Sequence, residues 1–518
     1  MTDTSTPSDQ DIDAEVAALS PWGRRWLLTV AGLSVLLVIS SMIALNTALP
    51  DIAVETAASQ AQLTWIVDAY TLAMACLLLP AGALGDRYGR RGALLIGLLI
   101  FGLASAAPML YDSPVALITA RAAAGVGAAF VMPATLSLLT AAFPKAERTK
   151  AIGIWAGVAG SGAIAGFLGT GVLLQHFSWP SVFIALAVAA AAMFVCACTI
   201  GSSRDQTATP IDWVGAAIIG TAIAVFVVGL IEAPTQGWTH PLVLGGLAGG
   251  VILVVVFAIV EMRRAHPLLD VRLFARADFT TGAVCITILF LSNFGFFFLL
   301  MQYLQLMMGF SALTTGVALA PIVVPILALS ATIHLCVAKI GLRWTVTAGL
   351  VLIAIGLYCV KFLDVDSVYV DVLWPMLLIA AGVGLCTAPA TSAIMNAVPD
   401  EKQGVASAVN DTTREVGAAI GVAVAGSILA ASYRNALTPH IAGFPSQVRD
   451  TATDSLAAAL SISERLGPQG AALSEAARTA FLQGTGHAVV ALAGIVFFSA
   501  VFVAVWAPGR DGKQLFRK

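Results

Sequence analysis

The segment Gly82-Ala83-Leu84-Gly85-Asp86-Arg87-Tyr88-Gly89-Arg90-Arg91 lies between two long apolar stretches of the chain. Glycines let a backbone turn sharply where other helices pack close by. Asp86 and Arg90 are four residues apart, a spacing at which two side chains on a helical turn can pair. The segment therefore predicts a tight, charged turn at a membrane surface. We expect it to act as a conformational hinge, through Gly82, Asp86, Arg87, Gly89, Arg90 and Arg91.

The composition is that of a membrane protein. Of the 518 residues, 59% are hydrophobic and only 11% are charged, and the mean hydropathy is +0.91, so most of the chain is expected in lipid. The formal net charge of −2 argues against nucleic-acid binding. All seven cysteines fall within apolar stretches, which predicts small core residues with neither a disulfide framework nor a metal site.

Runs of about 20 apolar residues, the length that crosses the apolar part of a bilayer, predict fourteen membrane helices. The expected helices span residues 26–49, 63–83, 92–110, 115–139, 151–174, 181–201, 213–231, 241–260, 280–301, 312–337, 345–362, 373–395, 405–432 and 481–506. An even number places both termini on one side. Of the 27 Lys and Arg residues, 20 lie on the side of the N-terminus, five on the opposite side and two within helices. Because basic residues collect on the cytoplasmic side, both termini are predicted to be cytoplasmic in a multi-pass protein of the inner membrane.

The two halves of the chain repeat one another. Residues 124–127 (Ala-Gly-Val-Gly) precede Pro133-Ala134-Thr135, and residues 381–384 (Ala-Gly-Val-Gly) precede Pro389-Ala390-Thr391. The charged turn also has a worn second copy, in which Lys339, Gly341 and Arg343 correspond to Arg87, Gly89 and Arg91, while Ala338 replaces the acid. Such a repeat predicts two six-helix bundles, one of which can rock against the other around a mid-membrane site.

The expected fold is therefore an all-α membrane protein of two six-helix bundles with an inserted helical hairpin. The expected domains are a disordered acidic tail (1–22), a first bundle (23–201), two inserted helices (202–262), a second bundle (263–507) with a long extracytoplasmic loop (433–480), and a cytoplasmic tail (508–518).

Five charged residues fall within the predicted helices: Asp68, Arg121, Asp411, Arg414 and Glu415. A charge inside a membrane helix costs several kcal/mol unless it is paired or hydrated. These residues are therefore candidates for coupling between protons and substrate. Asp68 and Arg121 lie at similar depths, which permits an ion pair, whereas Arg414 can neutralise only one of its two acidic neighbours. Structural ion pairing for Asp68 and a favourable helix-start position for Asp411 remain open alternatives.

Further residues are expected to line a cavity or to pack helices. The polar and aromatic candidates for cavity lining are Asn46, Tyr70, Asn293, Phe297, Gln302 and Tyr303. Gly162 and Gly166 form a Gly-x-x-x-Gly pair in the fifth helix, which lets helices approach closely. This pair indicates either a gating role or tight packing alone.

The charged turn at 82–91 resembles the loop between helices 2 and 3 of the major facilitator superfamily, whose pattern is Gly-x-Leu-[Ala/Gly]-Asp-Arg-x-Gly-Arg-[Arg/Lys]. Within that superfamily, residues 20–507 resemble the fourteen-helix drug:proton antiporters. Residues 63–72, 267–274 and the long loop before the last helix are similar to QacA-type quaternary-ammonium exporters.

This resemblance implies roles for several of the intramembrane charges. Asp68 matches an acid implicated in cation recognition or coupling, and Asp411 and Glu415 match an acidic patch of the thirteenth helix. Arg121 fits the arginine of the fourth helix. The sequence departs from the family pattern at three positions. Ser41 replaces a membrane acid of the first helix, Phe167 replaces the usual proline of the fifth, and Ile326 stands where similar members have an acid in the tenth.

The expected function is proton-coupled efflux of lipophilic, preferentially cationic, drugs or amphiphiles by alternating access. The expected partners are these substrates, protons and membrane lipid, with the proton as coupling ion, no other cofactor, and a monomer favoured. One alternative is an exporter of a dedicated metabolite, lipid or self-made antibiotic, and another is a non-transporting receptor or sensor. An enzyme is not expected, because no His/Cys cluster or nucleophile–base constellation appears in the sequence.

Overall fold

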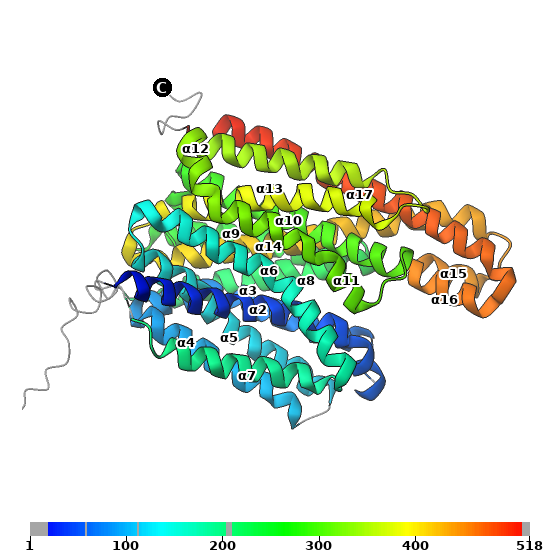
Figure 1. The fold of residues 1–518 in the computed structure, drawn as a ribbon, viewed down its shortest axis with the longest axis horizontal. Coiled ribbons are helices and arrows are strands. Elements are labelled where there is room, and N and C mark those ends of the chain that lie inside the picture. The colour runs from blue at the N-terminus through cyan, green and yellow to red at the C-terminus, as the bar shows by residue number, and fades with distance from the viewer. Residues whose placement is uncertain are drawn as a thin grey trace, which may run out of the picture.

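A computed structural model describes residues 19–56, 58, 60–110, 113–201, 203 and 210–509, and this part of the chain is helical with no strand (Figure 1). Residues 1–18 of the expected tail and 510–518 at the other end lie outside the described residues. The first bundle holds α2 (Pro21–Thr56), α3 (Gln60–Tyr88), α4 (Arg90–Ala106), α5 (Pro114–Ala142), α6 (Lys145–His176) and α7 (Pro180–Ala197). The hairpin is α8 (Trp213–Gln236) and α9 (Pro241–Arg263). The second bundle holds α10 (Ala277–Gln302), α11 (Ala312–Leu319), α12 (Val323–Val360), α13 (Tyr369–Asn396), α14 (Gln403–Leu437) and α17 (Ala471–Trp506).

The expected number of membrane crossings is confirmed once one long helical stretch is divided. Thirteen stretches of the described chain are long and apolar enough to cross a membrane, and one of them, Leu313–Val360, has 48 residues. At 1.5 Å per residue that stretch is about 70 Å long, against about 30 Å for the apolar core of a bilayer. It turns at Gly341, whose φ of 79° is a left-handed value that favours glycine. The stretch therefore makes two crossings, which gives fourteen in all.

The repeat extends to the backbone of the two charged turns. Gly89, the residue directly before α4, has a φ of 114°, and Gly341, the equivalent residue of the second copy, has a φ of 79°. Both copies thus use a glycine with positive φ to reverse the chain between consecutive helices. α2 begins and α17 ends at the same end of the molecule, as an even number of crossings requires (Figure 1).

The two bundles meet along two seams. α3 and α5 of the first bundle pack against α14 of the second, and α6 packs against α12 and α13. Glycines allow the closest approaches. A Cβ at Gly82 would overlap the backbone of Gly404, and a Cβ at Gly153 would overlap the carbonyl oxygen of Ser330.

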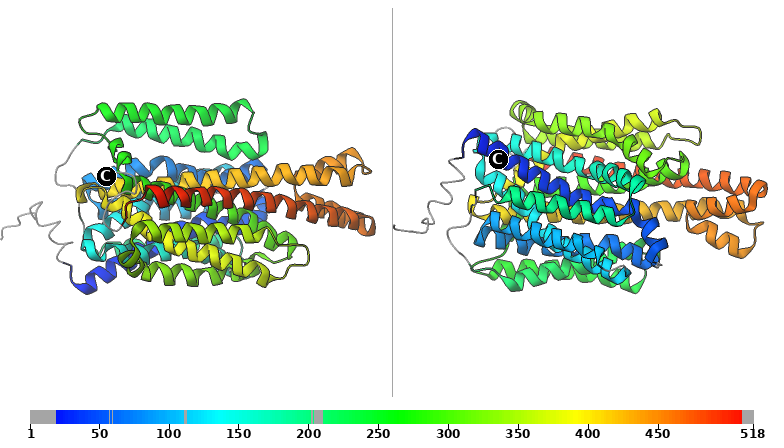
Figure 2. Two further views of the ribbon diagram at one scale, coloured as in Figure 1. Left: turned by 90° about the horizontal axis from the view of Figure 1, so that it is seen from above. Right: turned by 60° about the horizontal axis from the view of Figure 1, so that its bottom comes forward.

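The hairpin covers one of these seams. α8 lies against α3, where Gly220 adjoins the Cys76 carbonyl, and against α14, where Pro234 adjoins Gly426. α9 packs on the outer side of α8 and is mostly exposed, as expected for a helix surrounded by lipid (Figure 2). The inserted helices therefore bridge both bundles instead of extending either one.

Two expected segments have a different structure. The expected loop at 433–480 is largely helical, because α14 continues to Leu437, α15 (Ser446–Asp454) and α16 (Leu456–Leu466) follow, and α17 begins at Ala471. These short helices are amphipathic and lack the long apolar run by which membrane helices are recognised. We call residues 438–470 the helical cap; it lies at one end of the molecule, beside the extended ends of α14 and α17 (Figure 2). The expected helix 312–337 is broken at Ala320–Ile322, where Pro321 has no backbone N–H to donate.

Candidate functional site

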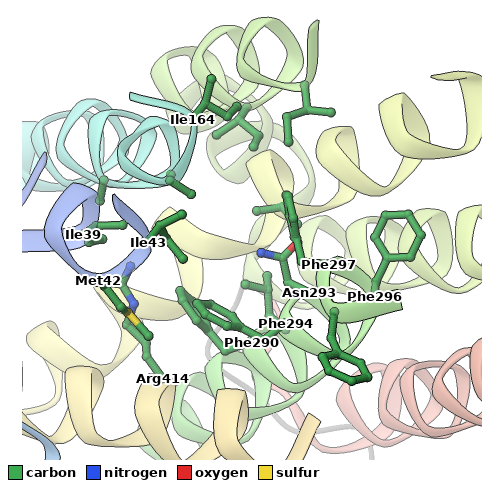
Figure 3. Close-up of a pocket in the computed structure, with 18 of the residues that line it drawn as sticks. Ile39, Met42, Ile43, Ile164, Phe290, Asn293, Phe294, Phe296, Phe297 and Arg414 are labelled. Carbon is green, nitrogen blue, oxygen red and sulfur yellow. The ribbon is translucent and has the colours of Figure 1, made fainter. Parts of the chain in front are cut away.

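A cavity of about 660 Å³ lies between the two bundles. Its walls come from α2, α3, α5 and α6 on one side and from α10, α12, α13 and α14 on the other (Figure 3). The lining is mainly apolar and rich in phenylalanine and methionine, above all Phe290, Phe294, Phe297, Met42, Met74 and Met301. This size and composition suit a drug-sized apolar molecule.

Arg414 and Glu415 are the charged residues among the described lining of this cavity. The Arg414 guanidinium lies 3.5 Å from an oxygen of Asp411. It also lies over two aromatic rings, with its central carbon 4.5 Å from the centre of Phe290 and 5.6 Å from that of Trp155. Arg414 is therefore held by one carboxylate and two ring faces.

Glu415 is different, because no hydrogen bond or ion pair reaches its carboxylate within the described part of the chain. It interacts electrostatically with Arg414 and Asp411 of its own helix and with Tyr70 of the first bundle. An acid that lines an apolar cavity with no close partner is available to a proton or to a cation that enters the cavity.

Arg121 is almost fully buried, and its partners are neutral. Its Nε donates to the Ile66 carbonyl (3.1 Å), and one terminal nitrogen donates to the Ser41 hydroxyl (3.1 Å). Its central carbon lies 4.2 Å from the ring centre of Tyr70. The other terminal nitrogen has no hydrogen-bond partner among the described residues. The expected pairing with Asp68 is absent, so the Tyr70 ring and two neutral oxygens take its place.

Asp68 is half-buried on α3 and is not among the residues that line the cavity. Glu232 of α8 interacts electrostatically with the Asp68 carboxylate, and because both groups are acids this interaction is repulsive. Asp411 lies one turn before Glu415 and is buried; one of its oxygens accepts from Asn410 (3.1 Å) and the other has no partner among the described atoms.

The remaining sequence candidates divide into lining and supporting residues. Asn293, Phe297 and Gln302 line the cavity. Tyr303 does not; its hydroxyl donates to the Asp364 carbonyl (3.4 Å). Tyr70 lies behind the wall and donates to the Val38 carbonyl (2.9 Å). The side chain of Asn46 lies outside the described residues.

Gly162 and Gly166 support the first bundle. A Cβ at Gly162 would lie 2.8 Å from Ile39, and a Cβ at Gly166 would lie 2.6 Å from the Ser40 carbonyl oxygen, both on α2. The Ser40 hydroxyl also donates to the Gly162 carbonyl (2.9 Å). Their position favours tight helix packing within one bundle over contact with the other bundle.

Two cavity residues, Phe290 and Phe294, are absent from the sequence candidates although a signal for them exists. With Asn293, Phe297 and Met301 they recur every three or four residues and so share one face of α10. Phe296 and Phe298 also belong to the lining, so the aromatic residues of the cavity are not confined to that one face, and the periodicity is obscured.

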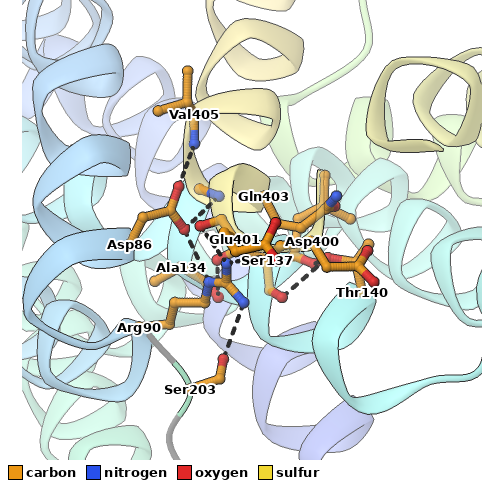
Figure 4. A network of polar contacts seen from close by, with 12 residues as sticks. Asp86, Arg90, Ala134, Ser137, Thr140, Ser203, Asp400, Glu401, Gln403 and Val405 are labelled. Atoms are coloured by element: carbon orange, nitrogen blue, oxygen red, sulfur yellow. Dashed lines mark hydrogen bonds and ion pairs between the residues drawn. The ribbon is translucent and has the colours of Figure 1, made fainter. Parts of the chain in front are cut away.

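After the two crossings of α2 and α3 the chain is back at the end where α2 begins. There the charged turn joins the first bundle to α14 of the second (Figure 4). Arg90 donates to an oxygen of Asp86 (2.9 Å), so the pairing predicted from their spacing is present. The Asp86 carboxylate also accepts from the backbone N–H groups of Gly404 (2.8 Å) and Val405 (3.0 Å), which are the free donors at the start of α14. An acid at a helix N-terminus is favoured by the helix dipole.

Further bonds around Arg90 strengthen this contact. Its terminal nitrogens donate to the Ser203 hydroxyl (3.1 Å) and to the carbonyls of Asp400 (2.8 Å) and Glu401 (3.1 Å). Arg148 of α6 pairs with the Asp400 carboxylate at 2.9 Å. Arg87, Gly89 and Arg91 complete the turn without lining the cavity. The turn thus binds the same helix, α14, that presents Glu415 to the cavity.

Two repeated membrane bundles around a shared central cavity, joined by a charged contact at one end, define a transporter of the alternating-access type. The sequence agrees: residues 31–422 match the profile of the Major Facilitator Superfamily. The chain belongs to this superfamily of membrane transporters, and the resemblance noted in the sequence is confirmed.

Relatives with similar sequences are drug-resistance proteins. The chain is 34% identical over 422 residues to the multidrug resistance protein Stp of Mycobacterium tuberculosis, covering 81% of this chain and 78% of Stp. It is 33% identical over 490 residues to the multidrug efflux pump LfrA of Mycolicibacterium smegmatis, covering 93% of this chain and 96% of LfrA. A solved structure of the proton:xylose symporter XylE has the same fold, with a TM-score of 0.62 at 13% identity over 96% of this chain and 98% of that one.

Proposed function

We propose that this protein exports lipophilic, preferentially cationic, drugs across the cytoplasmic membrane in exchange for protons. The observation that carries the proposal is the position of Glu415 in the wall of a large apolar cavity, where its carboxylate has no close partner among the described residues. The names of Stp and LfrA support drug efflux as the activity.

The exchange follows from the charge of Glu415. An ionised Glu415 attracts a cation in a medium of low dielectric constant, where that attraction is strong. Protonation removes the charge and with it the attraction, so a proton that reaches Glu415 favours release of the substrate. Asp411 and Arg414 set the local charge around this site. We assign Asp68 and Arg121 to the binding and transfer of the proton that is exchanged for the substrate.

The charged turn is the hinge of this cycle in our proposal. Asp86 and Arg90 bind the start of α14, so their contact exists only while the bundles are closed at that end. Opening that end breaks the bonds from Gly404 and Val405 to Asp86. With both termini cytoplasmic, the closed end is the cytoplasmic one, and the cavity then exchanges with the outside.

The test uses purified protein in liposomes with an imposed pH gradient and ethidium as a fluorescent lipophilic cation. We expect the wild-type protein to move ethidium against the proton flow and Glu415→Gln to lose most of that transport. Glu464→Gln, an equal change on the exposed surface of α16, is the control and should transport normally. Gradient-driven ethidium transport by Glu415→Gln at the wild-type rate would contradict the proposal.

A second candidate is an exporter of one dedicated natural product. The cavity wall carries the amides of Asn293, Gln302 and Gln305 besides Arg414, and such groups can bind an oxygen-rich metabolite. A narrow spectrum, with transport of a single metabolite and no transport of unrelated cations, would favour this candidate.

A further inference from the structure

The two seams between the bundles differ in what lies on their membrane side. The hairpin packs over the seam between α3 and α14, so α8 separates that seam from lipid (Figure 2). The seam between α6 and α12 carries exposed apolar side chains instead, since Val324 is 69% exposed and Leu327 is 38% exposed. Neither residue belongs to the described lining of the cavity, so both face the membrane. Lipid therefore reaches this second seam directly.

The cavity extends to the inner side of the same seam. Ile326, which directly precedes Leu327 in α12, lines the cavity together with Gly160 and Ile164 of α6 (Figure 3). Consecutive residues of a helix point in directions about 100° apart, so Ile326 faces the cavity while Leu327 faces the membrane. The wall between the apolar cavity and lipid is therefore thin at this level and is formed by these side chains.

Both ends of the seam are packed tightly. Toward the cytoplasmic end, a Cβ at Gly153 would overlap the carbonyl oxygen of Ser330, so backbone lies directly on backbone. Toward the outer end, a Cβ at Gly171 would lie 3.0 Å from Leu313 of α11. These two contacts hold α6 against the second bundle above and below the thin part of the wall.

The middle of the seam, about halfway along α6, is closed by side chains. A Cβ at Gly157 would lie 2.8 Å from a methyl carbon of Leu327, and a Cβ at Gly160 would lie 3.2 Å from a methyl carbon of Ile326. Side chains of this kind change rotamer without a shift of their helix. The middle of the seam can therefore open while both of its ends remain packed.

On the basis of the proposed function, we infer that the middle of the α6–α12 seam is a portal for the apolar tail of a single-tailed cationic amphiphile, and that Leu327 is the side chain that opens and closes it. The charged head stays in the cavity, whose wall contains Glu415. The tail passes between Leu327 and Gly157 into lipid, where its apolar surface avoids water. Tails too long for the cavity are thereby accepted.

Two ammonium ions with the same head and different tails test this inference: benzylethyldimethylammonium and benzyldodecyldimethylammonium. Each competes with ethidium transport by the full-length protein in liposomes under the pH gradient, at concentrations that do not permeabilise the liposomes. Leu327→Trp places a larger side chain over Gly157. The dodecyl compound should then compete at least roughly tenfold more weakly than with the wild-type protein, whereas the ethyl compound, which fits within the cavity, should compete equally well.

Leu335→Trp is the matched control, because Leu335 is another leucine of α12 and is 55% exposed; it should leave competition by both compounds unchanged. Leu327→Phe, a smaller increase in size, replaces the tryptophan variant if that variant does not insert. Equal weakening of both compounds at position 327, no change for the dodecyl compound, or the same loss in Leu335→Trp overturns the inference and leaves the proposed function standing. Failure of the wild-type protein to transport ethidium contradicts the proposed function, and the inference with it.

Discussion

Arg121 shows how a buried cation is kept in this protein without an acid beside it. Two neutral oxygens and the face of Tyr70 share the guanidinium charge. Tyr70 in turn interacts with Glu415 across the seam between the bundles. The Tyr70 ring therefore interacts both with the charge of the first bundle and with the acid of the second, and as a neutral group it cannot neutralise either one.

The bond from Arg121 to Ser41 predicts a difference between two serines of α2. Ser41→Ala removes the acceptor of a charged donor, so the free energy of unfolding should fall by about 1–3 kcal/mol. Ser34 is equally buried, and its hydroxyl has no partner in the described structure. Ser34→Ala should therefore leave the stability nearly unchanged. Thermal unfolding in detergent measures both variants, and equal losses would show that the Ser41 bond contributes nothing.

Sequence reasoning at this scale identifies the charged residues and only some of their partners. The Asp86–Arg90 pair is predictable because both residues belong to one turn of the chain. The partners of Asp86 on α14 are about 320 residues away and are backbone N–H groups, which every sequence contains. The sequence predicts that Arg121 pairs with Asp68 because the two residues lie at similar depths in the membrane, and depth along a helix can be calculated from residue number. The direction in which each side chain points cannot be calculated from residue number, and in the described structure Arg121 bonds to Ile66 and Ser41 instead of Asp68.

At the scale of the helices, glycines decide how closely the seams can close. Gly153 and Gly157 of α6 face Ser330 and Leu327 of α12, with no room for a methyl group at Gly153. Gly169, on the same helix, has open space where its Cβ would lie. One helix therefore offers both a tight and a free position for the same substitution.

Gly153→Ala should impair transport, because the added methyl group keeps α6 and α12 apart and disfavours the closed state by about 1–3 kcal/mol. A population shift of that size reduces the closed fraction roughly 5- to 150-fold. Gly169→Ala, the matched control, should transport at the wild-type rate. Transport is measured in the liposome assay after both variants are shown to insert equally. Normal transport by Gly153→Ala would mean that this seam does not close tightly during the cycle.

At the scale of the whole molecule, the topology is fixed by the number of membrane crossings and by the internal repeat that relates the two bundles. Apolar length and the internal repeat suffice to predict fourteen crossings, and the glycine at 341 reveals the one boundary that helix continuity hides. The break between α11 and α12 and the helical cap were not predicted. In those regions hydrophobic length carries no information, since short helices depend on tertiary contacts for their stability.

The orientation in the membrane has a direct test at the cap. Ser446 begins α15 and is exposed. Because both termini are expected to be cytoplasmic, a cysteine at this position should react with a membrane-impermeant maleimide added to intact cells. A cysteine at Glu401, on an exposed turn at the opposite end, should react only after lysis. The reverse pattern would invert the topology proposed here.

The extension of α14 and α17 beyond the other helices also gives the molecule an external lever. α17 has 36 residues, so it is about 54 Å long and reaches about 40 Å past the middle of a bilayer whose apolar core is about 30 Å thick. A tilt of about 10° at the membrane centre displaces the far end of such a rod by about 7 Å. The cap thus magnifies small rotations of the second bundle into displacements at the surface, where a bound antibody fragment would restrain the motion or a fluorescent label would report it.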